Sequence, residues 1–443
     1  MDSSAHIALG RFGLGRRGAE PLPGDPGRWL GAQLGPASAP EPVPPGGADP
    51  AAAFAALAER RLNPPPQAQP QGQPQGQQNG QPSPLRLIYV AEVAALADQA
   101  LATDQPFRER LVRFWTNHLT VSIRAGQVAP FAGDFVRAAI RPNVTGRFAD
   151  MLLAAMRHPA MLLYLNQAGS VGPASQAGLR SGRGLNENLA RECLELHTVS
   201  PAAGYSQSDV TAFAKILTGW SVQREPPAGF RFRPAAHEPG EHALLGRTFP
   251  EGEEGGVEAL RFLADHPATH RHLATKLVQH FVADDPAPGD IRAVEAALRD
   301  TGGNLGAAAH AVIGLPSAWI PLAKLRAPQD FAIAALRAAD LAPDQRTPLP
   351  GIAAGLGQPW FGAPAPNGWG DVAADWSGPE ALLRRVDWAY GFGGRADLPE
   401  PDAVAEAALG PLLQPATLTA MRRAGSRRDA MALLLTCPEF QRR

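Results

Sequence analysis

Apolar residues recur at helical spacing along most of the chain after Leu85, and this periodicity restricts the fold more than any other feature. A spacing of three and four residues puts apolar side chains on one face of a helix, where they can be buried together. The sequence therefore predicts a mainly α-helical fold, a globular array of many helices. The expected helices cover residues 86–103, 106–121, 127–140, 145–157, 184–197, 207–219, 256–265, 289–301, 304–313, 327–340, 379–391, 402–410 and 427–436, with a further helix from Pro267.

Local signals set some of the expected boundaries. Ser206 followed by Asp209 is typical of a capping box at a helix start. Pro267 suits the first turn of the helix that follows it, because that turn does not need its N–H group. Between Trp220 and Phe249 apolar and polar residues alternate, and this pattern predicts a small β-hairpin.

A segment rich in Trp, Pro and Gly at residues 356–379 breaks the helical pattern. Its three tryptophans, Trp360, Trp369 and Trp376, favour a long irregular loop anchored by buried indole rings. Such a loop either lines a functional site or simply covers the helical core. If it lines a site, Asn367 and Trp369 are candidate site residues.

The chain divides into three parts by composition. Residues 63–84 are dominated by Pro, Gln and Gly and cannot bury enough apolar surface to offset their ordering entropy, so we expect a disordered surface insertion. Residues 1–62 are expected to form an N-terminal helical arm that packs back on the main body. Residues 85–443 then form the main helical domain.

The net charge is −1 and the chain has two cysteines. The charge gives no reason to expect a nucleic-acid partner, and two cysteines exclude a disulfide framework or a cysteine-rich zinc module. No apolar run is long enough for a transmembrane segment, and polar residues interrupt the first residues where a signal peptide needs its apolar core. We therefore expect a soluble cytoplasmic protein, with export together with a partner as the alternative.

His118 falls at the centre of the apolar stripe of its predicted helix, beside Phe114 and Trp115. A buried imidazole needs a partner for its ring nitrogens: a backbone carbonyl, a carboxylate or a metal. His118 is therefore either a core histidine satisfied by protein groups or a ligand or acid–base group, in which case Asn117 lies next to the site.

The segment around residues 186–197 carries dense charge. At helical spacing its polar residues share one side, and its apolar residues share the other with His197. The polar side is either a solvated face with i,i+4 ion pairs, or a face that looks into a cleft and shares a divalent metal or a proton with His118. In the second reading the catalytic candidates are His118, Glu187, Arg191, Glu192 and Glu195, the metal ligands are His118, Glu192 and Glu195, and Asn186 and Asn188 are neighbouring polar residues.

Other candidates carry weaker signals. His266 and His270 have the i,i+4 spacing of a metal-binding pair, but Pro267 puts His266 at the helix cap, which favours a structural role. His272 and His280 are expected to be peripheral. Lys276 is one of only three lysines in an arginine-rich chain, so it is either a chance survivor or a residue whose compact ammonium is needed.

A series of segments in this order resembles a bacterial family, the domain of unknown function 1800. The residues that carry the resemblance are Arg11-Phe12-Gly13, RERLVRFWTNHLTVS at 108–122, HPAMLLYLN at 158–166, NENLARECLELHTVS at 186–200, GYSQSDVTAFAKILTGW at 204–220, HPATHRHLATKLVQHFVADDP at 266–286, the loop Pro359–Trp376 and the closing CPEFQRR. The chain departs from the family pattern at Glu238, where the family usually has Asp, and at Cys437, where it usually has Ser.

The resemblance implies no enzyme class, but it does imply a neighbour. The family is often encoded beside another uncharacterised family that is related to sulfatases and phosphatases and carries export signals. Two hypotheses follow: a metal- or acid–base-dependent enzyme with a His/Glu cleft, its cofactor unknown or a divalent metal, or a helical scaffold that binds a partner such as the sulfatase-like neighbour. An enzyme should hold His118 near a carboxylate and beside a cavity, whereas a scaffold should bury it against backbone and expose an apolar patch elsewhere.

Overall fold

The structure is a computed structural model that describes residues 3–36, 41–62, 82–341 and 348–443. Helices dominate this part of the chain, and its strands form two small antiparallel hairpins, so the predicted mainly α-helical fold is confirmed. Nearly all of the predicted insertion at 63–84 lies outside the described residues. The division into arm, insertion and main domain stays a prediction.

Proline starts many of the helices, because its fixed φ suits the first helical turn. It is the first residue of several long helices, which begin at Pro84, Pro106, Pro267, Pro288, Pro328 and Pro379. The helices before the strands are α1 (Ser4–Ile7), α2 (Pro26–Ala32), α3 (Pro50–Leu62), α4 (Pro84–Ala102), α5 (Pro106–His118), α6 (Ala132–Phe135), α7 (Phe148–Arg157), α8 (Pro159–Tyr164), α9 (Gln176–Ser181), α10 (Asn188–Glu192) and α11 (Gln207–Ile216). Those after the strands are α12 (Glu253–Ala264), α13 (Pro267–Phe281), α14 (Pro288–Asp300), α15 (Leu305–Ile313), α16 (Pro328–Ala339), α17 (Leu349–Gly355), α18 (Ala373–Trp376), α19 (Pro379–Gly393), α20 (Pro401–Ala408), α21 (Pro415–Arg422), α22 (Arg427–Thr436) and α23 (Pro438–Gln441).

Three predicted helices need correction. The helix expected at 106–121 ends at His118, since Leu119 has left the helical region of backbone dihedrals. The segment 127–140 is a short 3₁₀ turn, then α6, then a π turn at Val136–Ile140. The segment 184–197 begins only at Asn188 and closes with a π turn at Cys193–His197, which changes the direction of every side chain after Glu192 relative to a regular helix.

The β region contains two hairpins where one was expected. β1 (Trp220–Gln223) pairs with β2 (Gly229–Phe232), and β3 (His242–Leu244) pairs with β4 (Arg247–Phe249). The predicted capping box before α11 is present, with the Ser206 hydroxyl accepting from the Asp209 N–H and the Asp209 carboxylate accepting from the Ser206 N–H.

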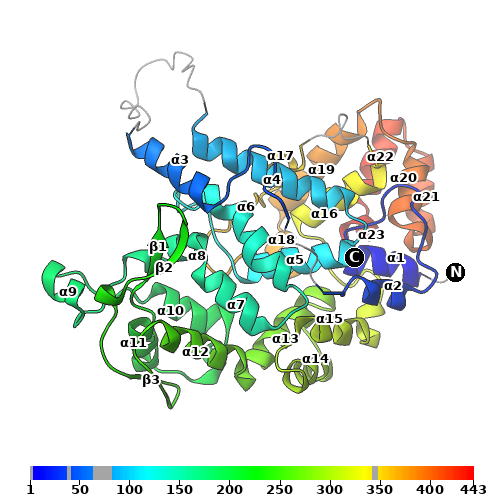
Figure 1. The fold of residues 1–443 in the computed structure, drawn as a ribbon. Helices are drawn as coiled ribbons and strands as arrows, with labels where there is room; N and C mark the ends of the chain where they lie inside the picture. Colours follow the sequence, from blue (N-terminus) through cyan, green and yellow to red (C-terminus); the bar gives the residue numbers. More distant parts are fainter. Residues whose placement is uncertain (1–2, 37–40, 63–81, 342–347) are drawn as a thin grey trace.

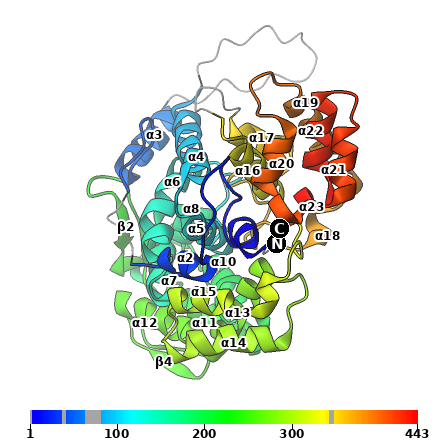
Figure 2. The ribbon, with the colours of Figure 1, turned by 90° about the vertical axis from the view of Figure 1, so that its right-hand side faces the viewer.

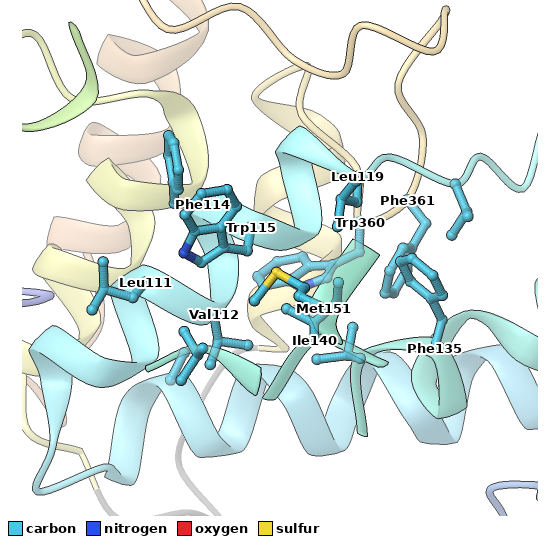
Figure 3. Packing of buried hydrophobic residues seen from close by; sticks show 14 of the residues in the cluster. Leu111, Val112, Phe114, Trp115, Leu119, Phe135, Ile140, Met151, Trp360 and Phe361 are labelled. Carbon is cyan, nitrogen blue, oxygen red and sulfur yellow. The ribbon is translucent and has the colours of Figure 1, made fainter. Parts of the chain in front are cut away.

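α5 lies near the centre of the molecule (Figure 1). Its apolar side chains Phe107, Leu111 and Trp115 are at most 1% exposed, which leaves His118 in the same buried stripe. Figure 3 shows the surroundings of this helix, where residues distant in sequence meet: Phe135, Ile140, Met151, Trp360 and Phe361. Burial of these large side chains contributes most of the stabilisation of such a core, at about 25 cal/mol per Å².

The N-terminal segment contacts the last residue of the chain through Arg11, and Figure 2 views the side of the molecule on which these two segments lie. Phe12 is fully buried against the rings of Phe107 and Phe281. Arg11 donates to the backbone carbonyls of Phe281 and Val282, and the Arg443 guanidinium donates to the Arg11 carbonyl at 3.0 Å. These contacts join both ends of the chain to the C-terminal end of α13.

The remaining helices surround this centre. In Figure 1 α7 and α10–α15 lie below α5, α4 and α17 above it, and α19–α22 to one side. α13, α14 and α15 pack in sequence, and α19 packs against α22. In the described part of the chain, every helix is too short or too polar to cross a membrane.

Candidate functional site

His118 is buried as predicted, at 7% exposure, but its partner is a backbone carbonyl. Its Nε2 lies 3.2 Å from the carbonyl oxygen of His197. Because a carbonyl only accepts, Nε2 carries the hydrogen and Nδ1 is left as an acceptor. Burial, followed by the nearby His272, His197 and Lys276, lowers the pKa of His118 well below its usual value, so the ring is neutral.

The neighbouring His272 makes an equivalent contact. Its Nε2 lies 3.0 Å from the carbonyl oxygen of Leu196. The last carbonyls of a helix have no N–H partner within the helix, and here two imidazoles supply donors to the end of the π turn at Cys193–His197. His197 itself is fully buried, neither of its ring nitrogens has a partner among the described residues, and burial lowers its pKa to about 3.

The residues do not form the predicted cleft between His118 and the carboxylates of Glu192 and Glu195. Glu192 and Glu195 are half-exposed and make no hydrogen bond or ion pair with His118 in the described structure. Burial and the charge of Glu195 raise the pKa of Glu192. The π turn explains the difference, because it presents the carbonyl of His197 to the His118 ring.

The rest of the charged segment connects helices on the outer part of the molecule. The predicted ion pair between Glu187 and Arg191 is present at 2.8 Å, and Glu187 also accepts from Gln207 and Thr211 of α11. The expected Arg191–Glu195 pair is not among the ion pairs of the described residues. The side chain of Asn186 accepts from the backbone N–H of Asn188, whose own side chain is exposed. Over the described ranges, no group of three or more His, Cys, Asp and Glu side chains could hold a metal ion.

Two adjoining cavities lie beside α5. The large cavity has a volume of about 120 Å³ and is lined by residues of α4, α5, the start of α16, His280 of α13 and the loop of residues 358–371. The small cavity has a volume of about 60 Å³ and is lined by Phe114, Asn117, His118, Leu196, Lys276, Asn367 and Asp371. Phe114, Asn117 and Asp371 line both cavities, so they separate the two hollows.

His280 and Asp371 form a hydrogen-bonded pair in the wall of the large cavity. His280 Nδ1 lies 2.8 Å from Asp371 Oδ2, and His280 Nε2 is buried without a partner among the described residues. Burial lowers the pKa of His280 to about 4. Burial raises the pKa of Asp371, but His280 and Lys324 lower it by more, so the net shift of the pKa is downward. The pair is therefore a neutral imidazole that donates to a carboxylate and keeps a free lone pair on Nε2.

The loop that carries Asp371 is fixed to α5 by a reciprocal pair of hydrogen bonds. Asn117 Nδ2 donates to the Trp369 carbonyl at 2.9 Å, and the Trp369 N–H donates to Asn117 Oδ1 at 2.8 Å. Gly368 has φ +74°, and a Cβ there would lie 2.5 Å from the carbonyl oxygen of Asn117. Only glycine fits this position, because both the left-handed backbone and the close approach exclude a side chain.

Buried charges hold the other end of the loop. The Lys324 ammonium, 1% exposed, contacts the Asp284 carboxylate and donates to the Asp371 carbonyl at 2.7 Å. Asp284 also accepts from the N–H of Ala373 at 2.7 Å. Arg443 donates to the backbone carbonyl of His280 at 3.1 Å. Lys324, another of the three lysines of the chain, therefore anchors the loop, while Lys276 lines the small cavity without a hydrogen-bond or ion-pair partner among the described residues.

These contacts sort the predicted site residues into two groups. Asn117, His118, Lys276, Asn367 and Trp369 line the cavities, whereas Trp115 packs in the core next to His118. Besides Trp115, the residues that do not line the cavities are Asn186, Glu187, Asn188, Arg191, Glu192, Glu195 and His197. His280 was expected to be peripheral, and this expectation is wrong. The sequence could have indicated His280 as a site residue, because His280 lies one turn beyond Lys276 on the same helix. It could not have indicated the partner, because Asp371 lies 91 residues away and only the fold brings it near His280.

The comparison with protein-family models agrees with the motif-by-motif resemblance. The chain matches the model described as "Protein of unknown function (DUF1800)" over residues 7–442. The chain belongs to this family. No curated protein and no solved structure matches it.

The two departures from the family pattern lie away from the cavities. Glu238 is buried, and its carboxylate accepts a hydrogen bond from the N–H of Ala174 at 2.8 Å. The other oxygen of this carboxylate lies 3.5 Å from the Lys215 ammonium. The sulfur of Cys437 accepts from the N–H of Phe440 at the start of α23. In this member of the family both positions therefore brace the backbone.

Proposed function

We propose that the protein is an acid–base enzyme that acts on a small molecule in the large cavity, with His280 as the general base and Asp371 as the residue that orients it. The observation that supports the proposal is the neutral His280 ring: its Nδ1 is hydrogen-bonded to Asp371, its Nε2 has no partner among the described residues, and the residue lines the large cavity. Because Nε2 itself is buried, a substrate reaches it only when the cavity wall opens around the ring. A histidine held in one tautomer by a carboxylate is suited to take a proton through its other nitrogen.

The proton balance is simple in this arrangement. His280 Nε2 accepts a proton from a substrate C–H or O–H group or from an attacking water, and the ring becomes an imidazolium. The adjacent Asp371 carboxylate stabilises that charge through the existing hydrogen bond. Return of the proton to product or solvent restores the neutral ring. The metal-dependent form of the hypothesis is not carried forward, since the donors expected for it, His118, Glu192 and Glu195, do not gather.

A label-incorporation experiment tests this proposal without a known substrate. Purified protein is incubated with pools of small organic molecules in deuterium oxide, or in water enriched in oxygen-18, and products are analysed by mass spectrometry. Proton abstraction introduces deuterium, and activation of water introduces the heavy oxygen. We expect incorporation that is lost in His280→Gln and retained in His310→Gln, a matched change at an exposed histidine of α15.

The tautomer can be checked independently by ¹⁵N NMR of the histidine rings. At pH 7 we expect His280 to be neutral, with its hydrogen on Nδ1 and a bare Nε2. A ring protonated on Nε2 at neutral pH would contradict the proposal, as would label incorporation that His280→Gln leaves unchanged.

A second candidate function is a helical scaffold, and an exposed apolar stripe on α19 favours it. Leu382, Leu383, Val386 and Tyr390 of this helix are 38–61% exposed and recur at helical spacing. The backbone contact of His118 is also what a scaffold predicts. Its test is co-expression with a member of the sulfatase-like neighbouring family, followed by size-exclusion chromatography. A complex that Leu383→Glu with Val386→Glu abolishes would support the scaffold, and two separate peaks from the wild type would contradict it.

A further inference from the structure

Arg113 differs from the other arginine in the wall of the large cavity. Arg110 donates to Asp330 at 2.7 Å, whereas the closest carboxylate oxygen to Arg113, also of Asp330, lies 3.9 Å away, beyond hydrogen-bond distance. Among the described residues, Arg113 makes one hydrogen bond, from Nη2 to Gln329 Oε1 at 2.7 Å. A guanidinium has five N–H donors, so several remain for an acceptor in the cavity.

The carboxylates of the cavity wall are already engaged. Both oxygens of Glu109 accept hydrogen bonds from Arg141, one from each terminal nitrogen of its guanidinium. Asp330 accepts from Arg110, and Asp371 accepts from His280. An anion that enters the cavity therefore meets carboxylates that already accept hydrogen bonds and a guanidinium that keeps unused N–H donors. Burial lowers the pKa of Arg113, and the partial compensation by Asp330 and Glu109 leaves a net downward shift.

The position of Arg113 is fixed by its neighbours. Its guanidinium carbon lies 5.3 Å from the centre of the Trp360 ring, a cation–π distance. Gln329, which holds the guanidinium, is itself held by Gln358 through two hydrogen bonds of 2.8 Å. The fork is thus oriented before any ligand arrives, which reduces the entropy cost of binding.

We propose that the large cavity binds a small organic carboxylate, with Arg113 holding its two oxygens. This deepens the proposed function, since it rests on His280 acting on the same bound molecule. A planar guanidinium matches a planar carboxylate in two parallel hydrogen bonds, whereas a phosphate commonly gathers several cations. The volume of about 120 Å³ has room for roughly four water molecules at about 30 Å³ each, so the occupant is a short-chain acid.

Binding of hexanoate, its neutral analogue hexanamide, and inorganic phosphate to the full chain tests the proposal by calorimetry and thermal shift. We expect hexanoate to bind wild type at least about ten-fold more tightly than hexanamide, the effect of one charge-assisted hydrogen bond, and phosphate to bind more weakly than hexanoate. Arg113→Gln should lose the preference for the acid. Arg384→Gln, a change at an exposed arginine on α19, should keep it.

Equal binding of acid and amide to the wild type would overturn the proposal, as would tighter binding of phosphate or an acid preference that survives Arg113→Gln. If Arg113→Gln does not fold, the wild-type comparison and Arg113→Lys decide, because Lys keeps the charge but loses the fork and should weaken the preference. His280→Gln should retain hexanoate binding while losing label incorporation. Failure of the acid–base proposal and failure of the carboxylate site therefore give different results.

Discussion

Two regions of the molecule carry dense polar side chains on or near α5, and they differ in what those side chains face. In the segment from Glu187 to His197, charged groups pair with one another or with α11, or face solvent. The backbone carbonyls of its π turn accept hydrogen bonds from the imidazoles of His118 and His272. In the region of His280 and Asp371, buried polar groups face one another and a cavity. The difference shows that density of charge along a helix indicates a site only when a third element closes a hollow over it.

The largest effect should come from the loop that closes this hollow. Gly368→Ala puts a methyl group against the Asn117 carbonyl in a left-handed backbone, and we expect a loss of about 4 kcal/mol in the free energy of unfolding. Gly351→Ala in α17, where a Cβ meets open space, should be neutral or stabilising. Denaturant unfolding measures both. Similar stabilities for the two variants would contradict the close approach between the loop and α5.

The pH dependence of stability tests the burial of His280. Its pKa falls from 6.5 in the unfolded chain to about 4 in the folded protein, so the unfolded state binds the proton first as pH falls. The stability from this group is complete above pH 6.5 and declines toward pH 4, by roughly 3 kcal/mol. We expect the free energy of unfolding of His280→Asn to depend less steeply on pH in this window than that of the wild type. Parallel curves would show that His280 is accessible to protons in the folded state.

The two regions can be compared directly at asparagine. Asn117→Ala removes both hydrogen bonds to Trp369 and should cost about 1–3 kcal/mol, because buried backbone groups of the loop lose their partners. Asn188→Ala in the charged segment removes an exposed side chain and should change stability by less than about 0.5 kcal/mol. Thermal unfolding of the pair checks the contrast. Equal costs would mean that the two regions are equally constrained.

The smallest effect should be at Glu192. Burial and Glu195 raise its pKa, so its charged form is slightly unfavourable in the folded protein. Glu192→Gln should leave stability at pH 7 unchanged or increase it by less than about 0.5 kcal/mol, without effect on label incorporation. A loss of incorporation equal to that of His280→Gln would restore the charged segment as part of the site.

The spacing of apolar residues determined the fold class and most of the helices, because helical periodicity is a local property that each segment carries by itself. The same reasoning placed His118 in the core and found the Trp-rich loop, with Asn117, Asn367 and Trp369 at the cavity. It also identified Lys276 as a lysine worth explaining, and the motifs identified the family.

Only the tertiary structure decided which polar residues meet. A regular helical wheel could not predict the π turn, which places the His197 carbonyl within hydrogen-bond distance of His118. Nor could local pattern pair His280 with Asp371 or leave Arg113 without a close carboxylate, because those relations join elements far apart in the chain. Hydrophobic periodicity specifies what each segment buries, whereas the partner of a buried polar group depends on the packing of all the others.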